Sequence, residues 1–481
     1  MSSVLQRDAA AGTAPATRGR LRGFHSGARE IDSADMQVAG ALPDWLRGSL
    51  LLNGPALWDL PNGGYRHWFD GLAMLHRVRF DGGRATYRSR YVQSEDYRQS
   101  VVNGAPAFSA FDTRNPESLI ARLKNLAKPN SSDNPAVVMS RIGERWFANT
   151  ESPHLVGFDP DTLDTLPRMM FDDDLGIQLM AAHGITDARG EYWNVGITLG
   201  PKCVYKLFRL RPGSRQRELF ASIRVGKSGY THAFAMTPQH ALIWETAMRA
   251  RPLGFLFSGR SYIHNFKWDP GHGSMLHAVS LADGGVRSWD LPPMMCFHAI
   301  QAYERRDEIV AELIVYDDAT VFDDLLLERL RNGTPLRATP RLMRYRLHTG
   351  RSDALFEAFG EGFELPQVNP SCLATTEAGV AWGAGADVGH GSIFFDRTLR
   401  LDLESGERRM WQRPGAVQLE PLFVARPGSS IEDDGVLLVP TLADDDTTTV
   451  IGVIDASTMQ CLAMLQAPQV VPFGFHAAWA G

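Results

Sequence analysis

The stretch Val-Arg-Phe-Asp-Gly-Gly-Arg-Ala-Thr-Tyr, residues 78–87, places an Asp-Gly-Gly turn between two short runs of β-branched and aromatic residues. Aspartate and glycine adopt the backbone conformations that a tight hairpin turn needs. The stretch therefore predicts a β-hairpin. Similar turns between apolar runs recur along the chain, at residues 143–144, 187–190, 283–285, 349–350, 404–406 and 455–458.

These hairpins recur through the whole length without alternating with helices. Such a pattern is typical of a closed or radially repeated all-β architecture. No fixed sequence repeat and no interdomain linker stand out, so we expect one domain over residues 23–481. This length suits a β-propeller of about six to eight blades. Residues 1–22 are rich in Ala, Arg, Thr and Ser, and we expect a disordered tail there.

Composition excludes several classes of protein. The chain has 481 residues, of which 49 are basic and 55 acidic, so it lacks the excess of positive charge that nucleic-acid binding requires. The four cysteines form no CxxC pair, which favours a reducing compartment. No uninterrupted apolar run reaches the roughly eighteen residues of a transmembrane helix, and no secretory signal begins the chain. These features predict a cytoplasmic protein.

Two segments are predicted to be helical. Pro116–Lys128 has proline and glutamate early, lysine late, and a stripe of Leu119, Ile120, Leu123 and Leu126 at helical spacing. This segment is either a surface helix packed on the propeller or an interfacial helix through which the protein contacts a membrane peripherally. The second segment, Val321–Asn332, has several apolar residues on one side and is expected to form a capping insertion.

Four histidines carry the strongest chemical signal. Each is flanked by small or apolar residues, and they are His183 in MAAHGI, His232 in YTHAFAM, His298 in CFHAI and His476 in FGFHAAW. Such imidazoles are expected to be buried, and a buried imidazole needs partners for both ring nitrogens. One buried histidine is usually a core residue bound to the backbone, but four in similar settings indicate a shared role.

The intervals between these histidines are 49, 66 and 178 residues. Zinc fingers and HExxH helices use much shorter spacings. Long intervals suit ligands that separate repeating units deliver to a common axis, and a site made only of imidazoles suits Fe, Cu, Zn or Ni. His277 is the rival candidate, because its neighbours Met275 to Val279 are equally apolar.

These and further motifs resemble the carotenoid cleavage oxygenases, with the animal branch of central-cleavage β-carotene dioxygenase and retinoid isomerohydrolase as the expected nearest group. The resemblance covers nearly the whole chain from about Gly40. The segments that carry it, besides the histidines in their order, are Asn53-Gly54-Pro55, His67-Trp68-Phe69-Asp70-Gly71 with His76, Arg88–Val92, Phe147–Glu151, Phe363–Gln367 and Leu419–Val424.

The resemblance implies a seven-bladed β-propeller with a helical cap over its top face. It also implies one iron(II) per chain, held by His183, His232, His298 and His476. Three carboxylates would accept hydrogen bonds from these imidazoles, and they are Glu151, Glu364 and Glu420. Such partners fix the ring orientation of a ligand and raise its basicity. The order of the histidines in the family implies that His277 is a core residue and not a ligand. By the same resemblance, His67 and Asp70 are structural. Thr150 would partly shield an open iron position.

The chain also departs from the family's pattern. The animal branch has a Pro-Asp-Pro-Cys-Lys run linked to membrane attachment, whereas residues 113–118 read TRNPES and contain no cysteine. Lipid anchoring is therefore not expected at this point. After His183 the chain has Gly-Ile where the family has proline, and after His232 it has alanine where the family has aspartate.

Four functions are compatible with these residues. The first is an iron(II) dioxygenase that uses O2 to cleave a carotenoid or apocarotenoid C=C bond into aldehyde, retinal-type products. The second is a retinyl-ester isomerohydrolase, and the third is a stilbene-cleaving dioxygenase. The fourth is an inactive propeller that serves as a binding scaffold. The complete set of histidines and carboxylates argues against this fourth function.

Overall fold

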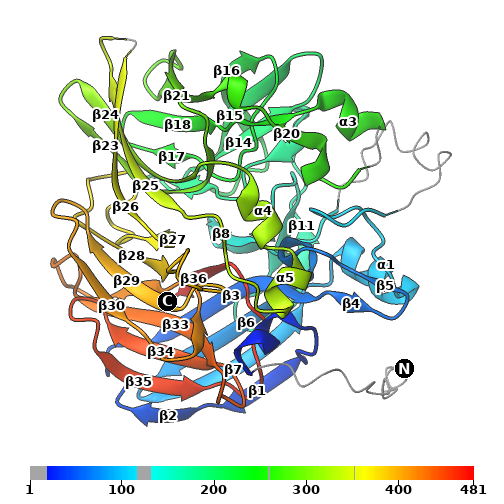
Figure 1. Cartoon of the computed structure of the whole chain (residues 1–481), viewed down its shortest axis with the longest axis vertical. Helices are drawn as coiled ribbons and strands as arrows, with labels where there is room; N and C mark the ends of the chain where they lie inside the picture. Colours follow the sequence, from blue (N-terminus) through cyan, green and yellow to red (C-terminus); the bar gives the residue numbers. More distant parts are fainter. Residues whose placement is uncertain (1–18, 116–131, 258–259, 352) are drawn as a thin grey trace.

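The computed structural model describes residues 19–115, 132–257, 260–351 and 353–481. Figure 1 shows antiparallel sheets arranged around a common centre, which confirms the seven-bladed β-propeller. Each hairpin predicted from the turn residues is present. The stretch at residues 78–87 forms the end of β6 and the first half of β7, with Asp81 opposite Arg84.

The first four blades follow the chain from residue 31 to residue 291, with one strand added from the C-terminus. Blade one contains β1 (Ile31–Asp35), β3 (Gly48–Leu57), β6 (Leu72–Asp81), β7 (Arg84–Tyr91) and β36 (His476–Ala480). Blade two contains β8 (Val138–Ile142), β9 (Arg145–Asn149), β10 (Leu155–Phe158) and β11 (Thr165–Arg168). Blade three contains β12 (Leu179–Met180), β13 (Ile185–Thr186), β14 (Tyr192–Thr198), β15 (Cys203–Leu210) and β16 (Arg217–Val225). Blade four contains β17 (Ala235–Met236), β18 (His240–Glu245), β21 (Ser274–Ser280) and β22 (Val286–Leu291).

The remaining three blades complete the ring. Blade five contains β23 (Met295–Arg305), β24 (Glu308–Tyr316), β25 (Arg341–His348) and β26 (Ala354–Glu361). Blade six contains β27 (Phe363–Gln367), β28 (Val380–Gly385), β29 (Arg397–Asp402) and β30 (Arg408–Trp411). Blade seven contains β2 (Gln37–Gly40), β31 (Ala416–Gln418), β32 (Leu422–Ala425), β33 (Gly435–Ala443), β34 (Val450–Asp455) and β35 (Cys461–Gln466).

Two short hairpins and several helices lie outside the blades. The hairpins are β4 (Asp59–Leu60) with β5 (Gly63–Gly64), and β19 (Met248–Ala250) with β20 (Phe266–Trp268). The helices are η1 (Gly19–Phe24), η2 (Trp68–Asp70), α1 (Glu95–Asn103), α3 (Pro252–Phe257), η3 (Ile263–Asn265), η4 (Pro270–His272), α4 (Thr320–Asp324) and α5 (Leu327–Arg331).

Strands from both ends of the chain close the ring. The C-terminal strand β36 pairs with β3 of blade one, which places His476 opposite Asn53. The N-terminal strand β2 pairs with β35 of blade seven. Each end therefore completes the blade built mainly from the opposite end, which protects strand edges that would otherwise be open.

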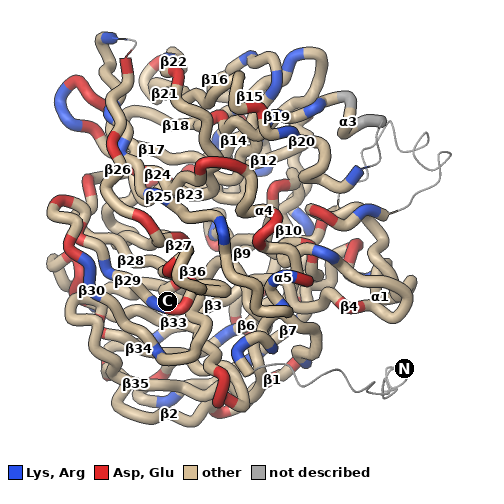
Figure 2. Tube along the Cα trace, in the orientation of Figure 1, with Lys and Arg blue, Asp and Glu red and all other residues tan. Residues whose placement is uncertain are grey.

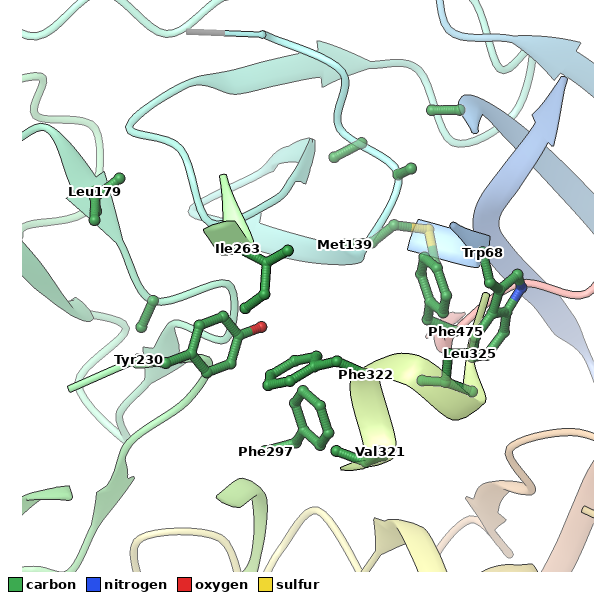
Figure 3. Close-up of a cluster of buried hydrophobic side chains, with 14 of the residues drawn as sticks. Trp68, Met139, Leu179, Tyr230, Ile263, Phe297, Val321, Phe322, Leu325 and Phe475 are labelled. Carbon is green, nitrogen blue, oxygen red and sulfur yellow. The ribbon is translucent and has the colours of Figure 1, made fainter. Parts of the chain in front are cut away.

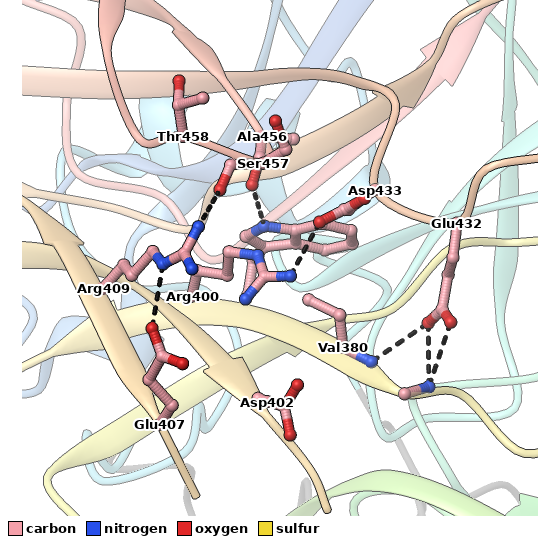
Figure 4. Close-up of polar contacts among 12 residues, drawn as sticks. Val380, Arg400, Asp402, Glu407, Arg409, Glu432, Asp433, Ala456, Ser457 and Thr458 are labelled. Carbon is pink, nitrogen blue, oxygen red and sulfur yellow. Dashed lines mark hydrogen bonds and ion pairs between the residues drawn. The ribbon is translucent and has the colours of Figure 1, made fainter. Parts of the chain in front are cut away.

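Contacts between blades six and seven show how neighbouring sheets are joined (Figure 4). The indole of Trp382 donates to the Ala456 carbonyl at 2.9 Å, and Arg400 pairs with Asp433 at 2.7 Å. The Trp382 ring also stacks on Phe423 with ring centroids 4.3 Å apart. Apolar stacking and buried polar contacts thus hold the two sheets in a fixed relation, which matters because each blade contributes part of the central site.

The segment expected to form one helix at Val321–Asn332 forms two short ones, α4 and α5. The break follows from a backbone pairing: the Trp68 N–H donates to the Leu325 carbonyl, and the Leu327 N–H donates to the Arg66 carbonyl. Leu326 is accordingly extended, with φ of −63° and ψ of 132°. This tertiary contact outweighs local helix propensity.

The expected boundary at residue 23 falls within η1, whose Leu21 and Phe24 are buried. Residues 1–18 and the helix expected at Pro116–Lys128 lie outside the described residues. In the part of the chain that the structure does describe, no helix is long and apolar enough to cross a membrane. Figure 2 shows acidic and basic positions interspersed along the trace rather than gathered by sign.

Candidate metal centre

The four predicted histidines converge at the centre of the propeller. One nitrogen atom from each of His183, His232, His298 and His476 lies within 4.8 Å of the others. The Nε2 atoms of His183 and His476 are 3.1 Å apart. Imidazole nitrogens bind a metal such as zinc at about 2.0–2.1 Å, so two adjacent ligands are separated by about 3 Å. The cluster therefore has the dimensions of a metal site.

Four different blades supply these side chains. His183 follows β12 and His232 precedes β17, while His298 lies within β23 and His476 begins β36. Each of these strands is at the edge of its sheet. The edge strands meet at the centre of the ring, and this arrangement explains why the histidines are separated by long and unequal intervals.

Each of the three predicted carboxylates contacts one of the histidines. Glu151 lies 2.6 Å from His232 Nδ1, Glu364 lies 2.7 Å from His298 Nδ1, and Glu420 lies 2.9 Å from His476 Nδ1. Because each carboxylate accepts a hydrogen bond from Nδ1–H, the imidazole proton is on Nδ1. The lone pair of Nε2 is then directed toward the cluster. Among the described residues, His183 has no carboxylate partner.

A further layer of donors holds the carboxylates themselves. The Tyr230 hydroxyl donates to Glu151, the Tyr316 hydroxyl donates to Glu364 at 3.0 Å, and the Gln367 amide donates to Glu420 at 3.1 Å. Backbone N–H groups of Leu365 and Ala477 add bonds of 2.7 and 2.6 Å to Glu364 and Glu420. The roles of Tyr230, Tyr316 and Gln367 were not predicted from the sequence, because nothing in their local sequence indicates what they contact.

Irregular backbone aims two of these groups. The β23–β24 register shifts between Cys296 and Ala299, which spans His298, and the β27–β28 register shifts after Glu364. Leu365 has a positive φ of 52°, which is uncommon for a residue with a branched side chain. Bulges often occur next to functional sites, where they redirect side chains. Here they turn His298 and Glu364 toward the central axis.

Burial lowers the pKa of two of the four histidines. Loss of hydration, followed by repulsion from the other three imidazoles, holds the pKa of His183 well below its ordinary value. Burial also lowers the pKa of His232, although Glu151 opposes this effect. Burial raises the pKa of Glu364, but the attraction of His298 and three hydrogen bonds outweigh it and leave the pKa below its usual value. Neutral imidazoles beside ionised carboxylates are the forms that bind a metal.

The donor set fits a transition-metal ion. The Nε2 atom of His298 is buried and has no hydrogen-bond partner among the described residues. Leaving such an atom unpaired costs about 1–3 kcal/mol, so a ligand for it is expected. Imidazole nitrogens suit Fe, Cu, Zn or Ni rather than Mg or Ca.

The other residues singled out from the sequence lie outside the four-histidine cluster. His277 is in β21, away from the cluster, and its Nδ1 bonds to the Ser288 hydroxyl at 2.7 Å. His67 and Asp70 are buried and cap the helix η2. Thr150 lines the cavity beside Glu151.

An apolar cavity of about 360 Å³ leads to the cluster, and His232, His298 and His476 form part of its wall. Aromatic side chains form a large part of the rest of the lining, including Phe69, Phe111, Phe297 and Phe475. Figure 3 shows Phe297 and Phe322 beside each other, with Val321 and Phe322 on α4 and Tyr230 opposite. The cavity has the size and character of a site for an apolar small molecule.

Comparison with known proteins identifies the family. Residues 24–481 match the family model described as retinal pigment epithelial membrane protein, RPE65. The chain belongs to the carotenoid cleavage oxygenase family. A rice protein, carotenoid cleavage dioxygenase 8 homolog A, chloroplastic, is 33% identical over 99% of this chain and 91% of its own length. The mouse beta,beta-carotene 15,15'-dioxygenase is 26% identical over 86% of this chain and 83% of its own length.

Solved structures of the family have the same fold. Cobalt-substituted Synechocystis apocarotenoid oxygenase superposes with a TM-score of 0.81 at 23% identity, over 96% of this chain and 98% of that one. The rice protein shares more identity with this carotenoid oxygenase than the mouse dioxygenase does. The animal branch was expected to be the nearest group, but this chain is at least as similar in sequence to plant proteins of the family.

Proposed function

We propose that this protein is a non-haem iron(II) dioxygenase that cleaves one C=C bond of a carotenoid or apocarotenoid into two carbonyl products. The observation that carries the proposal is a cluster of four imidazoles, three of them bound to buried carboxylates, at the wall of an aromatic cavity. Relatives named as carotenoid dioxygenases support it.

His183, His232, His298 and His476 would hold the iron. When bound, iron(II) would supply the redox chemistry that lets dioxygen react with an alkene. The donor set of four imidazoles supports a transition metal at this position. Four neutral imidazoles leave the charge of the site at that of the metal, and the three carboxylates offset that charge within a buried setting.

The chain's own residues contribute orientation and exclusion of water. Glu151, Glu364 and Glu420 hold three of the imidazole rings, while the aromatic walls align a rigid polyene beside the cluster. The reaction balances without a further reductant, because both atoms of O2 enter products: one C=C bond and the O–O bond break, and two C=O bonds form. Thr150, at the cavity wall, would limit the space open to dioxygen.

The substrate follows from the cavity. Its lining is mainly aromatic and aliphatic, which suits a long hydrocarbon chain with conjugated double bonds. Carotenoids and apocarotenoids have that chemistry, and the expected partners are such a substrate and O2. Peripheral membrane contact through Pro116–Lys128 stays a prediction from the sequence.

The test is aerobic incubation of the iron-loaded protein with β-carotene, apocarotenals, a retinyl ester and resveratrol, followed by mass analysis of the products. The proposal predicts two aldehyde or ketone fragments from a carotenoid or apocarotenoid, and none from protein with His298→Ala. Hydrolysis of the retinyl ester without carotenoid cleavage would favour the isomerohydrolase instead. Cleavage of resveratrol alone would favour a stilbene oxygenase.

A further inference from the structure

A second cavity, of about 480 Å³, adjoins the apolar one and is lined by basic side chains. Its charged and titratable lining residues are Arg66, Arg114, Arg251, Arg260, His264 and Asp112. They come from three parts of the chain: the start of η2, the segment after α1, and the region around α3 and η3. We call this cavity the arginine pocket.

Among the described residues that line the arginine pocket, four guanidinium groups face one carboxylate. Asp112 is buried and contacts His264 at 2.8 Å and Arg66 at 3.8 Å. Arg114 and Arg251 form no ion pair with any residue that the structure describes. Guanidinium groups held close together repel each other, and an anion placed among them relieves that repulsion. Their planar forks match a carboxylate in a bidentate arrangement.

Arg260 connects the arginine pocket to the substrate cavity, because it lines both. Close to Arg260 in the chain, backbone hydrogen bonds join Tyr262 to Ala110 at 3.0 Å and Ile263 to Phe111 at 2.9 Å. Tyr262 and Phe111 also line the apolar cavity. A rigid polyene that lies along these aromatic walls can therefore extend its end group past Arg260 into the arginine pocket.

We propose that the arginine pocket binds the carboxylate end group of an acidic apocarotenoid substrate, and so favours acids over the corresponding aldehydes and esters. This inference rests on the proposed function, since it assigns the end group of that same substrate. A source within the substrate is favoured over a lipid headgroup because Arg260 faces the interior cavity as well as the open pocket.

Equilibrium binding tests the inference without turnover. Quenching of tryptophan fluorescence would measure the affinity of metal-free protein for an apocarotenoic acid and for its methyl ester, since Trp68 lines the cavity. In wild type the acid is expected to bind more tightly. Removing two exposed charges with Arg114→Gln/Arg251→Gln should lower the acid-to-ester affinity ratio about three- to tenfold, from ion-pair contributions typical of exposed sites. Raising the salt concentration should lower the same ratio.

Arg84→Gln provides the matched control, because Arg84 is exposed at the β6–β7 turn of blade one. It should leave the acid-to-ester ratio at the wild-type value. An unchanged ratio in Arg114→Gln/Arg251→Gln would overturn the inference, as would a ratio of one in wild type. Loss of binding to anionic phosphatidylserine liposomes, with the ratio unchanged, would assign the arginines to lipid headgroups instead.

The failure of this inference is distinguishable from failure of the proposed function. If aldehydes are cleaved but the ratio does not respond to the substitutions, only the arginine pocket is wrongly assigned. If no carotenoid is cleaved and the acid still binds through the arginines, the pocket stands as a binding site and the reaction must be revised.

Discussion

Replacing Glu364 with glutamine isolates the charge of a carboxylate that orients a proposed iron ligand. Glu364 accepts three hydrogen bonds: two on Oε2, from His298 and from the Leu365 N–H, both at 2.7 Å, and one on Oε1, from Tyr316 at 3.0 Å. In Glu364→Gln the amide oxygen can occupy the Oε2 position and keep both N–H donors. The amide NH2 then faces the Tyr316 hydroxyl, which can accept. The number of hydrogen bonds is therefore preserved.

The magnitude follows from those contacts. A hydrogen bond to a charged group contributes about 1.5–3 kcal/mol and a neutral one about 1 kcal/mol. Two bonds to Oε2 each lose about 1 kcal/mol, and a total of about 2 kcal/mol corresponds to about a 30-fold change. This value lies within the roughly 10- to 100-fold cost typical of changes to the partners of metal ligands. Glu364→Gln should lower iron affinity, and kcat/KM for carotenoid cleavage, by about that factor.

Glu312 offers a matched control. It is a buried carboxylate in β24 that accepts from Gln301 at 2.9 Å and from Arg344 at 2.7 Å, and it contacts no member of the cluster. Glu312→Gln should lower the free energy of unfolding without changing iron affinity, measured by competition with a chelator. The reasoning is refuted if Glu364→Gln binds iron within about twofold of wild type, or if both variants lose iron equally.

Three further predictions concern other buried residues. His277→Ala should keep one iron per chain while losing stability, because this imidazole in β21 bonds to Ser288 of β22 and lies beside Glu245, away from the four-histidine cluster; iron loss measured by metal analysis would reassign the ligands. Tyr316→Phe should lower the free energy of unfolding by about 1–3 kcal/mol in denaturant titrations, since it leaves a buried oxygen of Glu364 without a donor; an unchanged midpoint would count against this. Burial lowers the pKa of His67 to about 4 from 6.5, so the unfolded chain takes up a proton first and stability should fall by about 3 kcal/mol between pH 6.5 and 4; His67→Gln should flatten this part of the profile.

Local sequence was sufficient to predict the hairpins and their turns. The Asp81–Gly83 turn between β6 and β7 depends on residues that are neighbours in the chain. The pairing of β36 with β3, and of β2 with β35, joins segments from opposite ends, and no local signal encodes it. The same limit explains why α4 and α5 were expected as one helix: the interruption at Leu326 comes from pairing with the segment around His67.

The site shows the same division between local and long-range information. Apolar neighbours indicated buried histidines, but they did not separate His277 from His298, because that distinction depends on which strand edge meets the propeller axis. Order along the family's pattern made the choice. Tyr230, Tyr316 and Gln367 could not be found from their local sequence, since each is defined only by the carboxylate it contacts after folding.

The most direct test of the central claim is the mass of both products formed from an apocarotenal under 18O2. The iron-loaded protein would be mixed briefly with substrate, and the carbonyl products reduced at once to alcohols, before their oxygen exchanges with water. Dioxygenase cleavage should give two fragments from one cleaved C=C bond, each with one 18O atom at the new terminus. Label in neither fragment, or fragments formed equally well without O2, would contradict it.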